Sequence, residues 1–208
     1  MLELEVDCKR FMKLFPREVR QRTARFVAKE IEGRTDVNET FFGNMATFHH
    51  QPFYIPEMSI PDLFAPNICA IDFALDHLSH EADLILDWGC GLGTCGQYLT
   101  QLGFRVCGYD NWSQLPKEVA ERFQARFDAP LWIVDDFRDI EPTVMMHVSM
   151  WCLDREAWDR PSVKWILSDT HYAENTFDAP TPPGFKLYGE YTAKGRCKNY
   201  LTVFRREM

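Results

Sequence analysis

The residues best suited to chemistry lie in one stretch, 84–112, with the sequence LILDWGCGLGTCGQYLTQLGFRVCGYDNW. It places a run of glycines after one short apolar segment and a carboxylate, Asp110, directly after a second. A glycine-rich turn after a strand lets the backbone approach a nucleotide closely, and the next helix begins beside the ligand. A carboxylate at the end of the second strand accepts hydrogen bonds from ribose hydroxyl groups. The stretch therefore predicts a nucleotide-binding turn, with Asp110 at the ribose.

The glycines of this turn fit two different patterns. Gly91, Gly93 and Gly96 fit GxGxxG, which is typical of dinucleotide sites. The alternative pattern, DxGxGxG, is supplied by Asp87, Gly89, Gly91 and Gly93. A carboxylate at position 87 contributes little to a site for an anionic pyrophosphate, whereas it can hold the turn or accept from an ammonium group. Asp87 therefore favours DxGxGxG.

Features outside the turn also count against a nicotinamide-binding enzyme. The C-terminal residues predict a hairpin, which would add an antiparallel strand to a parallel sheet. No separate substrate domain remains in a chain of 208 residues. Tyr191 and Lys194 also miss the Tyr-x-x-x-Lys spacing of short-chain dehydrogenases by one residue. These features again favour the DxGxGxG pattern.

Strand and helix patterns alternate over residues 67–208. Because such alternation implies crossover connections, we expect an α/β fold with a Rossmann-like, mostly parallel sheet and helices on both faces. A C-terminal antiparallel hairpin is predicted to turn at Lys194-Gly195-Arg196. The predicted helices are 67–78, 95–102 and 115–127, and the predicted strands are 84–86, 104–109, 131–134, 143–150 and 163–167.

Residues 1–66 predict an N-terminal helical extension followed by an aromatic covering segment, and residues 67–208 predict the main domain. Residues 7–32 carry a rough helical stripe of apolar side chains that ends at Gly33. Residues 35–66 are aromatic and punctuated by proline, which indicates an ordered segment because disordered linkers are poor in aromatic residues. The pattern leaves open whether this segment contributes to a site or only covers the core.

On these residues the chain resembles the class I S-adenosylmethionine-dependent methyltransferases. The resemblance covers roughly residues 67–208 and is strongest from Leu84 to Trp112. It implies S-adenosylmethionine (SAM) as the cofactor and the C-terminal hairpin as the sixth and seventh strands of the sheet. Asp110 then corresponds to the acidic residue that binds the ribose hydroxyls.

The same resemblance implies which residues hold the cofactor. The turn packs against the methionine part, the residues after Asp110 lie beside the adenosine, and an acidic residue with its neighbour contacts the adenine. Asp136 and Phe137 fit that last pair, although a surface acid and a core aromatic residue would give the same pattern. The implied cofactor residues are Asp87, Gly89, Cys90, Gly91, Gly93, Asp110, Asn111, Trp112, Asp136 and Phe137.

Methyl transfer from a sulfonium is an in-line displacement, in which the protein aligns the acceptor and removes a proton from a hydroxyl or ammonium acceptor. The acceptor-facing groups are expected at the C-terminal ends of the fourth and fifth strands. This chain has Ser149–Trp151 and Asp169–Tyr172 there. His171 is the candidate catalytic base because imidazole titrates near neutral pH. A structural histidine after a strand is the alternative.

The residues at these strand ends lack the motifs of several methyltransferase classes, which limits the class of methyl acceptor. Methyltransferases of base amines carry [DNS]PP[YFW] after the fourth strand, where this chain has Ser149-Met-Trp-Cys152, and no Pro-Cys pair is present for attack on a pyrimidine. Metal-dependent O-methyltransferases use carboxylates after both strands. Asp169 could supply one, but residue 149 is serine, so we predict no metal. We expect an O or N acceptor on a small molecule, a sugar or a protein.

The charge of the chain is unevenly distributed. The net charge is −8, yet residues 9–34 carry nine Lys or Arg against three Asp or Glu, and residues 186–208 carry six against two. Such basic ends could present a positive rim to an anionic substrate, or they could be solvated helix and strand faces. The negative total and the absence of interleaved aromatic and basic residues predict that nucleic acid is not a partner.

The seven cysteines are scattered without a CxxC pair, which indicates a reduced, cytosolic protein rather than a disulfide or zinc framework. No apolar run reaches the roughly 18 residues of a membrane span, and the N-terminus lacks the apolar core of a secretory signal. We therefore predict a cytoplasmic localisation without membrane association.

Two other functions stay open. A non-catalytic methyltransferase-like module would bind a partner through its basic ends. The short, proline-rich link at 173–184 favours that alternative, because the resembling family has a helix there. A nicotinamide-dependent oxidoreductase is the further alternative. The sequence does not indicate an oligomeric state.

Overall fold

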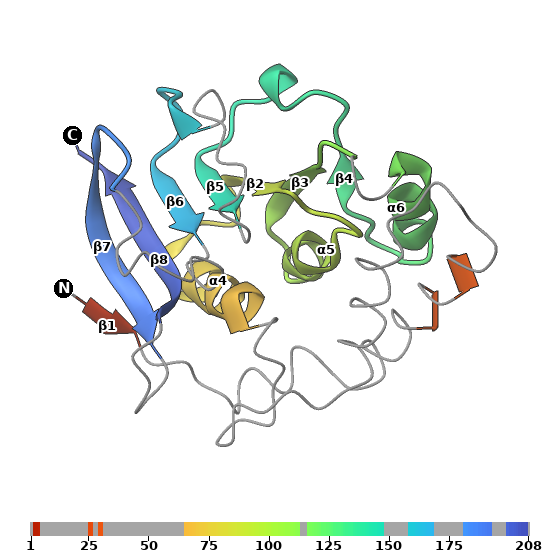
Figure 1. The fold of residues 1–208 in the computed structure, drawn as a ribbon, viewed down its shortest axis with the longest axis horizontal. Helices are drawn as coiled ribbons and strands as arrows, with labels where there is room; N and C mark the ends of the chain where they lie inside the picture. The colour runs from red at the N-terminus through yellow and green to blue at the C-terminus, as the bar shows by residue number, and fades with distance from the viewer. Residues whose placement is uncertain are drawn as a thin grey trace.

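The structure is a computed structural model, in which helices pack against a β-sheet (Figure 1). Nearly all of the predicted covering segment and most of the predicted helix 7–32 lie outside the residues that it describes. The same holds for Ser149, Asp169 and His171 at the predicted acceptor site. The described residues are 2–4, 25–26, 29–30, 65–112, 116–147, 158–168, 181–192 and 199–207.

The described strands form one eight-stranded sheet. They are β1 (Leu2–Leu4), β2 (Leu84–Trp88), β3 (Arg105–Tyr109), β4 (Trp132–Ile133), β5 (Val144–His147), β6 (Trp165–Ser168), β7 (Phe185–Thr192) and β8 (Asn199–Arg206). Their order is β1-β7-β8-β6-β5-β2-β3-β4 (Figure 1). Among them β8 pairs antiparallel with β6 and β7, and the remaining pairs are parallel. The predicted mostly parallel sheet with an antiparallel C-terminal hairpin is confirmed.

The apolar composition of β2 follows from its position at the centre of the sheet. Successive side chains of a strand point to opposite faces, so a central parallel strand needs apolar residues at nearly every position. Ile85 joins the core of one face and Leu86 the core of the other. The strand continues past the predicted end at residue 86, because the buried Asp87 and Trp88 keep the same pairing with β3.

Three α-helices of the described part are α4 (Ala65–His77), α5 (Thr94–Gln101) and α6 (Lys117–Gln124). α4 and α5 cover one face of the sheet, where Phe73 and Leu99 are buried. α6 packs beside β4 at the end of the sheet. It is shorter than the predicted 115–127, because the N–H groups of Arg126 and Phe127 bond to carbonyls three residues back and close the helix.

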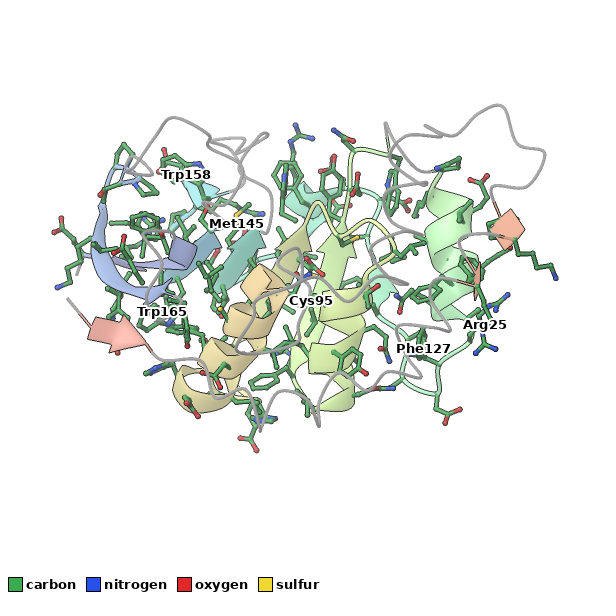
Figure 2. All side chains as sticks on the ribbon, turned by 60° about the horizontal axis from the view of Figure 1, so that its bottom comes forward. Arg25, Cys95, Phe127, Met145, Trp158 and Trp165 are labelled. Atoms are coloured by element: carbon green, nitrogen blue, oxygen red, sulfur yellow. The ribbon has the colours of Figure 1, made fainter. Side chains whose placement is uncertain are left out.

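The other face of the sheet is covered, in the part of the chain that the structure describes, by shorter elements. They are the 3-10 helix η2 (Phe137–Asp139) and the turn at residues 158–163. Trp158 and Val163 pack there against Met145 of β5, on the face opposite Cys95 of α5 (Figure 2). In the described part, α-helices therefore cover one of the two faces, and a 3-10 helix and a turn cover the other.

The strand β1 was not predicted. It pairs in parallel with β7, with Leu2 opposite Gly189 and Leu4 opposite Tyr191. The first residues alternate apolar and charged side chains, which is the pattern of a strand with one covered face. The N-terminal extension therefore contributes a strand as well as the helical residues 25–26 and 29–30.

Phe26 anchors the described helical residues of the extension to the main domain. Its ring is buried and lies 5.1 Å from the ring of Phe123 on α6, and the guanidinium of Arg126 lies over the Phe26 ring at 4.3 Å. Burying such a side chain contributes about 1.5–3 kcal/mol. The described helical residues of the extension thus contact the main domain through Phe26.

Candidate functional site

The glycine turn joins β2 to α5 at the carboxyl end of the sheet. Gly89, Gly91 and Gly93 have positive φ angles of 71°, 55° and 72°, which residues with a side chain rarely adopt. The N–H groups of Gly89 and Cys90 both donate to the carbonyl of Tyr109 at the end of β3, at 2.8 and 3.1 Å. The turn is therefore fixed to the neighbouring strand before α5 begins.

The glycines differ in what lies beside them. A Cβ built on Gly89 or Gly91 meets no atom of the described residues within 4 Å, so both border open space in that part of the chain. A Cβ on Gly93 would lie 2.5 Å from the nearest side-chain atom, and one on Gly96 would lie 2.9 Å from its nearest neighbours. Gly89 and Gly91 are thus accessible to a ligand, whereas Gly93 and Gly96 permit close packing of the turn and α5.

Asp110 brings the residues after β3 to the turn. Its two carboxylate oxygens accept hydrogen bonds from the N–H of Gly91, at 2.9 Å, and from the N–H of Trp112, at 3.1 Å. Trp112 has a φ of 56°, which is unusual for a bulky residue, and Asn111 before it is exposed. Each carboxylate oxygen has more than one lone pair, so Asp110 can accept a ribose hydroxyl as well.

Asp87 lies beneath the turn and is 3% exposed. Its Oδ2 accepts from the N–H of Gly96, in the first turn of α5, at 3.0 Å. Burial raises the pKa of Asp87 to about 7; the Gly96 hydrogen bond opposes this rise, and the nearby Asp110 carboxylate adds to it. The group is therefore poised between its two protonation states near neutral pH, and a cation beside it would favour the ionised form.

These hydrogen bonds determine which ligand charge suits the turn. In dinucleotide sites the N–H groups at the start of the helix face a pyrophosphate. Here the N–H of Gly91 donates to Asp110 and the N–H of Gly96 donates to Asp87. Asp110 at the turn and the ionised form of Asp87 beneath it repel an anion and attract a cation. The arrangement favours the DxGxGxG interpretation of the turn.

Gln124 supports the turn from α6, a role that was not predicted from the sequence. Its buried amide donates to the carbonyl of Leu92 at 2.6 Å and of Gly93 at 3.3 Å, and accepts from the N–H of Leu131 at 2.8 Å. A buried amide with all these partners ties two backbone segments, the turn and the residue before β4, to α6. The available signal was a polar residue next to Phe123 on the apolar face of a predicted helix.

Phe137, implied at the adenine, has its ring in the core. The side chain is 2% exposed, and its ring centroid lies 4.6 Å from that of Trp88 and 5.2 Å from that of Tyr109. The core aromatic residue that the pattern allowed as an alternative is therefore present. Because the ring is packed in the core, a ligand would contact the backbone of Phe137 instead. Its N–H is the first of η2 and therefore has no acceptor within that helix.

Asp136 is the N-cap of η2. Its Oδ1 accepts from the N–H of Arg138 at 2.9 Å, and its Oδ2 lies 3.1 Å from the Arg138 guanidinium. The backbone hydrogen bond and the guanidinium keep the pKa of Asp136 below its usual range. Because β3 and β4 are neighbours in parallel, the half-exposed Asp136 carboxylate lies at the same end of the sheet as Asp110. It remains a predicted adenine contact.

The cysteines near the turn are neutral thiols at neutral pH. Burial raises the pKa of Cys90 and of Cys95 well above the usual range, and it raises the pKa of Cys107 to about 12. All three are free, and the nearby Asp87 carboxylate raises each pKa further. A neutral thiol is a poor nucleophile, so Cys90 is limited to packing and positioning in the predicted site.

The predicted acceptor side is represented only by the ends of β5 and β6. β6 ends at Ser168, which is buried, and β5 ends at His147. The candidate base His171 is three residues beyond Ser168 and lies outside the described residues, so its role stays a prediction. The described residues contain no group of three or more His, Cys, Asp or Glu side chains that could hold a metal ion.

The sheet order and the glycine turn define a class I methyltransferase fold, and comparison with solved structures agrees. The crystal structure of MtNAS in complex with MTA and tNA has a TM-score of 0.53 at 16% identity, over 92% of this chain and 71% of that one. Magnesium protoporphyrin IX methyltransferase from Synechocystis PCC 6803 with bound SAH has a TM-score of 0.50 at 12% identity, over 92% of this chain and 98% of that one.

A third structure, a mutant of MtNAS in complex with S-adenosylmethionine, has a TM-score of 0.52 at 16% identity, over 91% of this chain and 72% of that one. At these identities the likeness shows a shared fold. The chain therefore has the fold of the class I SAM-dependent methyltransferases, as the resemblance implied. No protein-family model and no curated protein matches the sequence. In the part of the chain that the structure describes, no helix is long and apolar enough to cross a membrane.

Proposed function

We propose that the protein is a SAM-dependent methyltransferase that transfers a methyl group to an O or N acceptor on a small molecule, a sugar or a protein. The observation that carries the proposal is the pair of carboxylates at the turn. Asp87 and Asp110 occupy the N–H groups of Gly96 and Gly91, beside the open space at the turn. SAM carries a positive sulfonium and a positive ammonium against one carboxylate, and its adenosine is neutral, so its net positive charge suits that space.

The proposal gives each residue of the turn a part in cofactor binding. Gly89, Cys90 and Gly91 lie against the methionine part, and Gly93 lets the turn pack closely on its neighbours. Asp110 accepts from the ribose hydroxyls, with Asn111 and Trp112 beside the adenosine. Asp136 and the backbone of Phe137 contact the adenine. When bound, SAM supplies the methyl group on an activated sulfonium.

The chain itself has two tasks in this reaction. It must align the acceptor with the sulfonium, and it must remove a proton where the acceptor is a hydroxyl or an ammonium group. Both tasks belong at the carboxyl ends of β5 and β6, where His171 is the proposed base. Nucleic acid is left out of the acceptor classes because the base-methylation motifs are missing and the net charge is −8.

Binding experiments separate this function from its alternatives. A methyltransferase binds both SAM and its demethylated product S-adenosylhomocysteine (SAH), and NAD(H) does not displace them. A nicotinamide-dependent oxidoreductase binds NAD(H) more tightly, and a non-catalytic module that has lost the site binds neither. Isothermal titration with SAM, SAH and NADH distinguishes these outcomes directly. A structure with SAH bound would then show the acceptor side beside the vacant methyl position.

Asp110→Ala should weaken SAH binding by about 1–3 kcal/mol, or about 5- to 150-fold, because ribose hydroxyls and two backbone N–H groups lose their acceptor. Asp110→Asn should weaken it less, since the amide retains one acceptor oxygen. The control is Asp128→Ala, which removes an exposed carboxylate beyond the C-terminal end of α6. Unchanged SAH affinity in a folded Asp110→Ala protein would remove Asp110 from the site.

Cofactor affinity should rise with pH around neutrality. The free protein keeps Asp87 largely protonated below its pKa of about 7, whereas a bound ammonium group favours the ionised form. Binding therefore releases a proton, and the affinity for SAH should increase about tenfold from pH 6 to pH 8 and then level off. Titrations in buffers of different ionisation enthalpy count the released protons.

Asp87→Asn is the control for this pH dependence. The amide keeps an oxygen for the Gly96 N–H but has no proton to release, so the affinity should be lower at pH 8 and nearly independent of pH. A wild-type affinity that does not change between pH 6 and pH 8 would show that no cation lies beside Asp87.

A further inference from the structure

Arg160 holds the 3-10 helix η2 from the turn at residues 158–163. Its Nη1 donates to the carbonyl of Phe137 at 2.9 Å, and its Nη2 lies 3.4 Å from the carbonyl of Arg138. The same Nη2 pairs with the Glu141 carboxylate at 3.0 Å. The Arg160 side chain is 14% exposed, so water competes little for these contacts.

The carbonyl held by Arg160 belongs to a peptide unit that also orients Asp136. That unit joins Phe137 to Arg138, and its N–H donates to the Asp136 carboxylate at 2.9 Å. A peptide unit is planar, so fixing its C=O also fixes the direction of its N–H. Arg160 therefore binds the C=O at one edge of this planar unit, and the N–H at the opposite edge holds the Asp136 carboxylate.

Arg160 is itself held in place by the C-terminal strand. Its own carbonyl accepts from the Arg206 guanidinium at 2.7 Å, and the same side chain donates to the carbonyls of Val163, at 2.6 Å, and Trp158, at 3.3 Å. The Arg206 guanidinium lies 4.4 Å from the ring centroid of Phe185. Three carbonyls and a ring thus fix the backbone from which Arg160 extends.

We propose that Arg160 is a positioning residue for base recognition. It acts through the peptide unit 137–138 to orient the Asp136 carboxylate, and through the 3-10 turn that it holds to orient the Phe137 N–H, toward the adenine. The proposal rests on the proposed function. It deepens that function, because it assigns the choice of base to a residue that does not itself touch the cofactor. The Phe137 ring, packed on Trp88, fixes the same segment from inside the core.

The chemistry of the two groups explains why their direction decides the base. The exocyclic amine of adenine donates, so it suits a carboxylate, and its ring nitrogens accept, so they suit an N–H. Hypoxanthine has a carbonyl in place of the amine and a protonated ring nitrogen beside it. Both hydrogen bonds then meet the wrong partner. A well-oriented η2 therefore selects adenine, and a poorly oriented one loses that selectivity.

The test compares the affinities for SAH and for S-inosyl-L-homocysteine, in which hypoxanthine replaces adenine, by isothermal titration. The ratio of the two affinities does not depend on the fraction of folded protein, so it responds to orientation and not to stability. Wild-type protein should prefer SAH at least about 30-fold, since two hydrogen bonds are mismatched in the analogue. Arg160→Gln should reduce this preference about three- to tenfold, mainly by weakening SAH binding.

Two further variants separate the contacts of Arg160. Arg160→Lys keeps the charge but not the forked geometry, so its preference should lie between those of wild type and Arg160→Gln. Glu141→Gln removes the ion pair and leaves both carbonyl contacts, so its preference should stay within about twofold of wild type. If Arg160→Gln does not fold, Arg160→Lys carries the test alone, and thermal unfolding of each variant identifies that case.

The outcomes distinguish this inference from the proposed function. Equal losses of affinity for both ligands in the Arg160 variants, with an unchanged ratio, would make Arg160 purely structural and overturn the inference. Wild-type protein that binds SAH without preferring it to the inosine analogue would also overturn the inference, and would leave the proposed function intact. Wild-type protein that binds neither ligand would instead contradict the proposed function.

Discussion

We expect the Gly91→Val protein to bind SAH at least about 100-fold more weakly than wild type, a loss of about 3 kcal/mol. In the part of the chain that the structure describes, a Cβ at Gly91 meets no atom within 4 Å, so the valine side chain would occupy the space that the proposal assigns to the cofactor. The φ of 55° adds backbone strain for a β-branched residue, which weakens the turn further. Isothermal titration with SAH measures the loss.

Two asparagine variants separate steric exclusion from backbone strain. Asparagine tolerates the left-handed region better than other residues with a side chain. Gly91→Asn should therefore keep most of the stability and still exclude the cofactor. Gly184→Asn is the matched control, because Gly184 has a φ of 80° and its nearest neighbour to a Cβ lies at 3.9 Å, in a turn before β7. Normal SAH binding by a folded Gly91→Val protein would contradict the DxGxGxG assignment.

The largest expected effect on stability is that of Gly93→Ala. A Cβ there would lie 2.5 Å from Leu131 Cδ2 and 2.9 Å from Gln124 Nε2, and the Gln124 amide cannot move without breaking its backbone hydrogen bonds. Overpacking, together with a φ of 72°, should lower the free energy of unfolding by about 2–4 kcal/mol. Denaturant unfolding monitored by circular dichroism measures this change.

Gly91→Ala is the matched comparison for Gly93→Ala. It places the same methyl group on a glycine of the same turn and with a similar φ, but in open space. We expect it to cost only about 1 kcal/mol, from the backbone conformation alone. If both alanine variants destabilise the protein equally, the close packing around Gly93 does not matter for stability.

The sequence predicted the parts of the molecule whose signals are local. A buried parallel strand needs a continuous apolar run, so the run ending at Leu86 revealed β2, and the glycines after it revealed the turn. A carboxylate directly after an apolar segment placed Asp110 at the end of β3. The hydrogen bond between Asp110 and the Gly91 N–H joins these two predictions in space.

The parts that were missed depend on contacts between distant segments. Gln124 bonds to the turn more than thirty positions earlier, and Arg160 bonds to a carbonyl of η2. Neither contact produces a periodic pattern, since backbone carbonyls accept from any donor within reach. The role of Phe137 was ambiguous for a related reason. The sequence pattern of an aromatic residue after a strand does not depend on whether its ring contacts a ligand or, as here, Trp88.

The pairing of β1 with β7 has a consequence for how the chain folds. It joins Leu2–Leu4 to Gly189–Tyr191, two segments that are far apart in the sequence. During synthesis β1 leaves the ribosome long before its partner exists, and closing so large a loop is slow. Until it closes, β7 presents a row of unpaired N–H and C=O groups along an open sheet edge. The pairing of β1 with β7 therefore comes late in folding. Low protein concentration favours this pairing within one chain over association of two incompletely folded chains through their β7 edges.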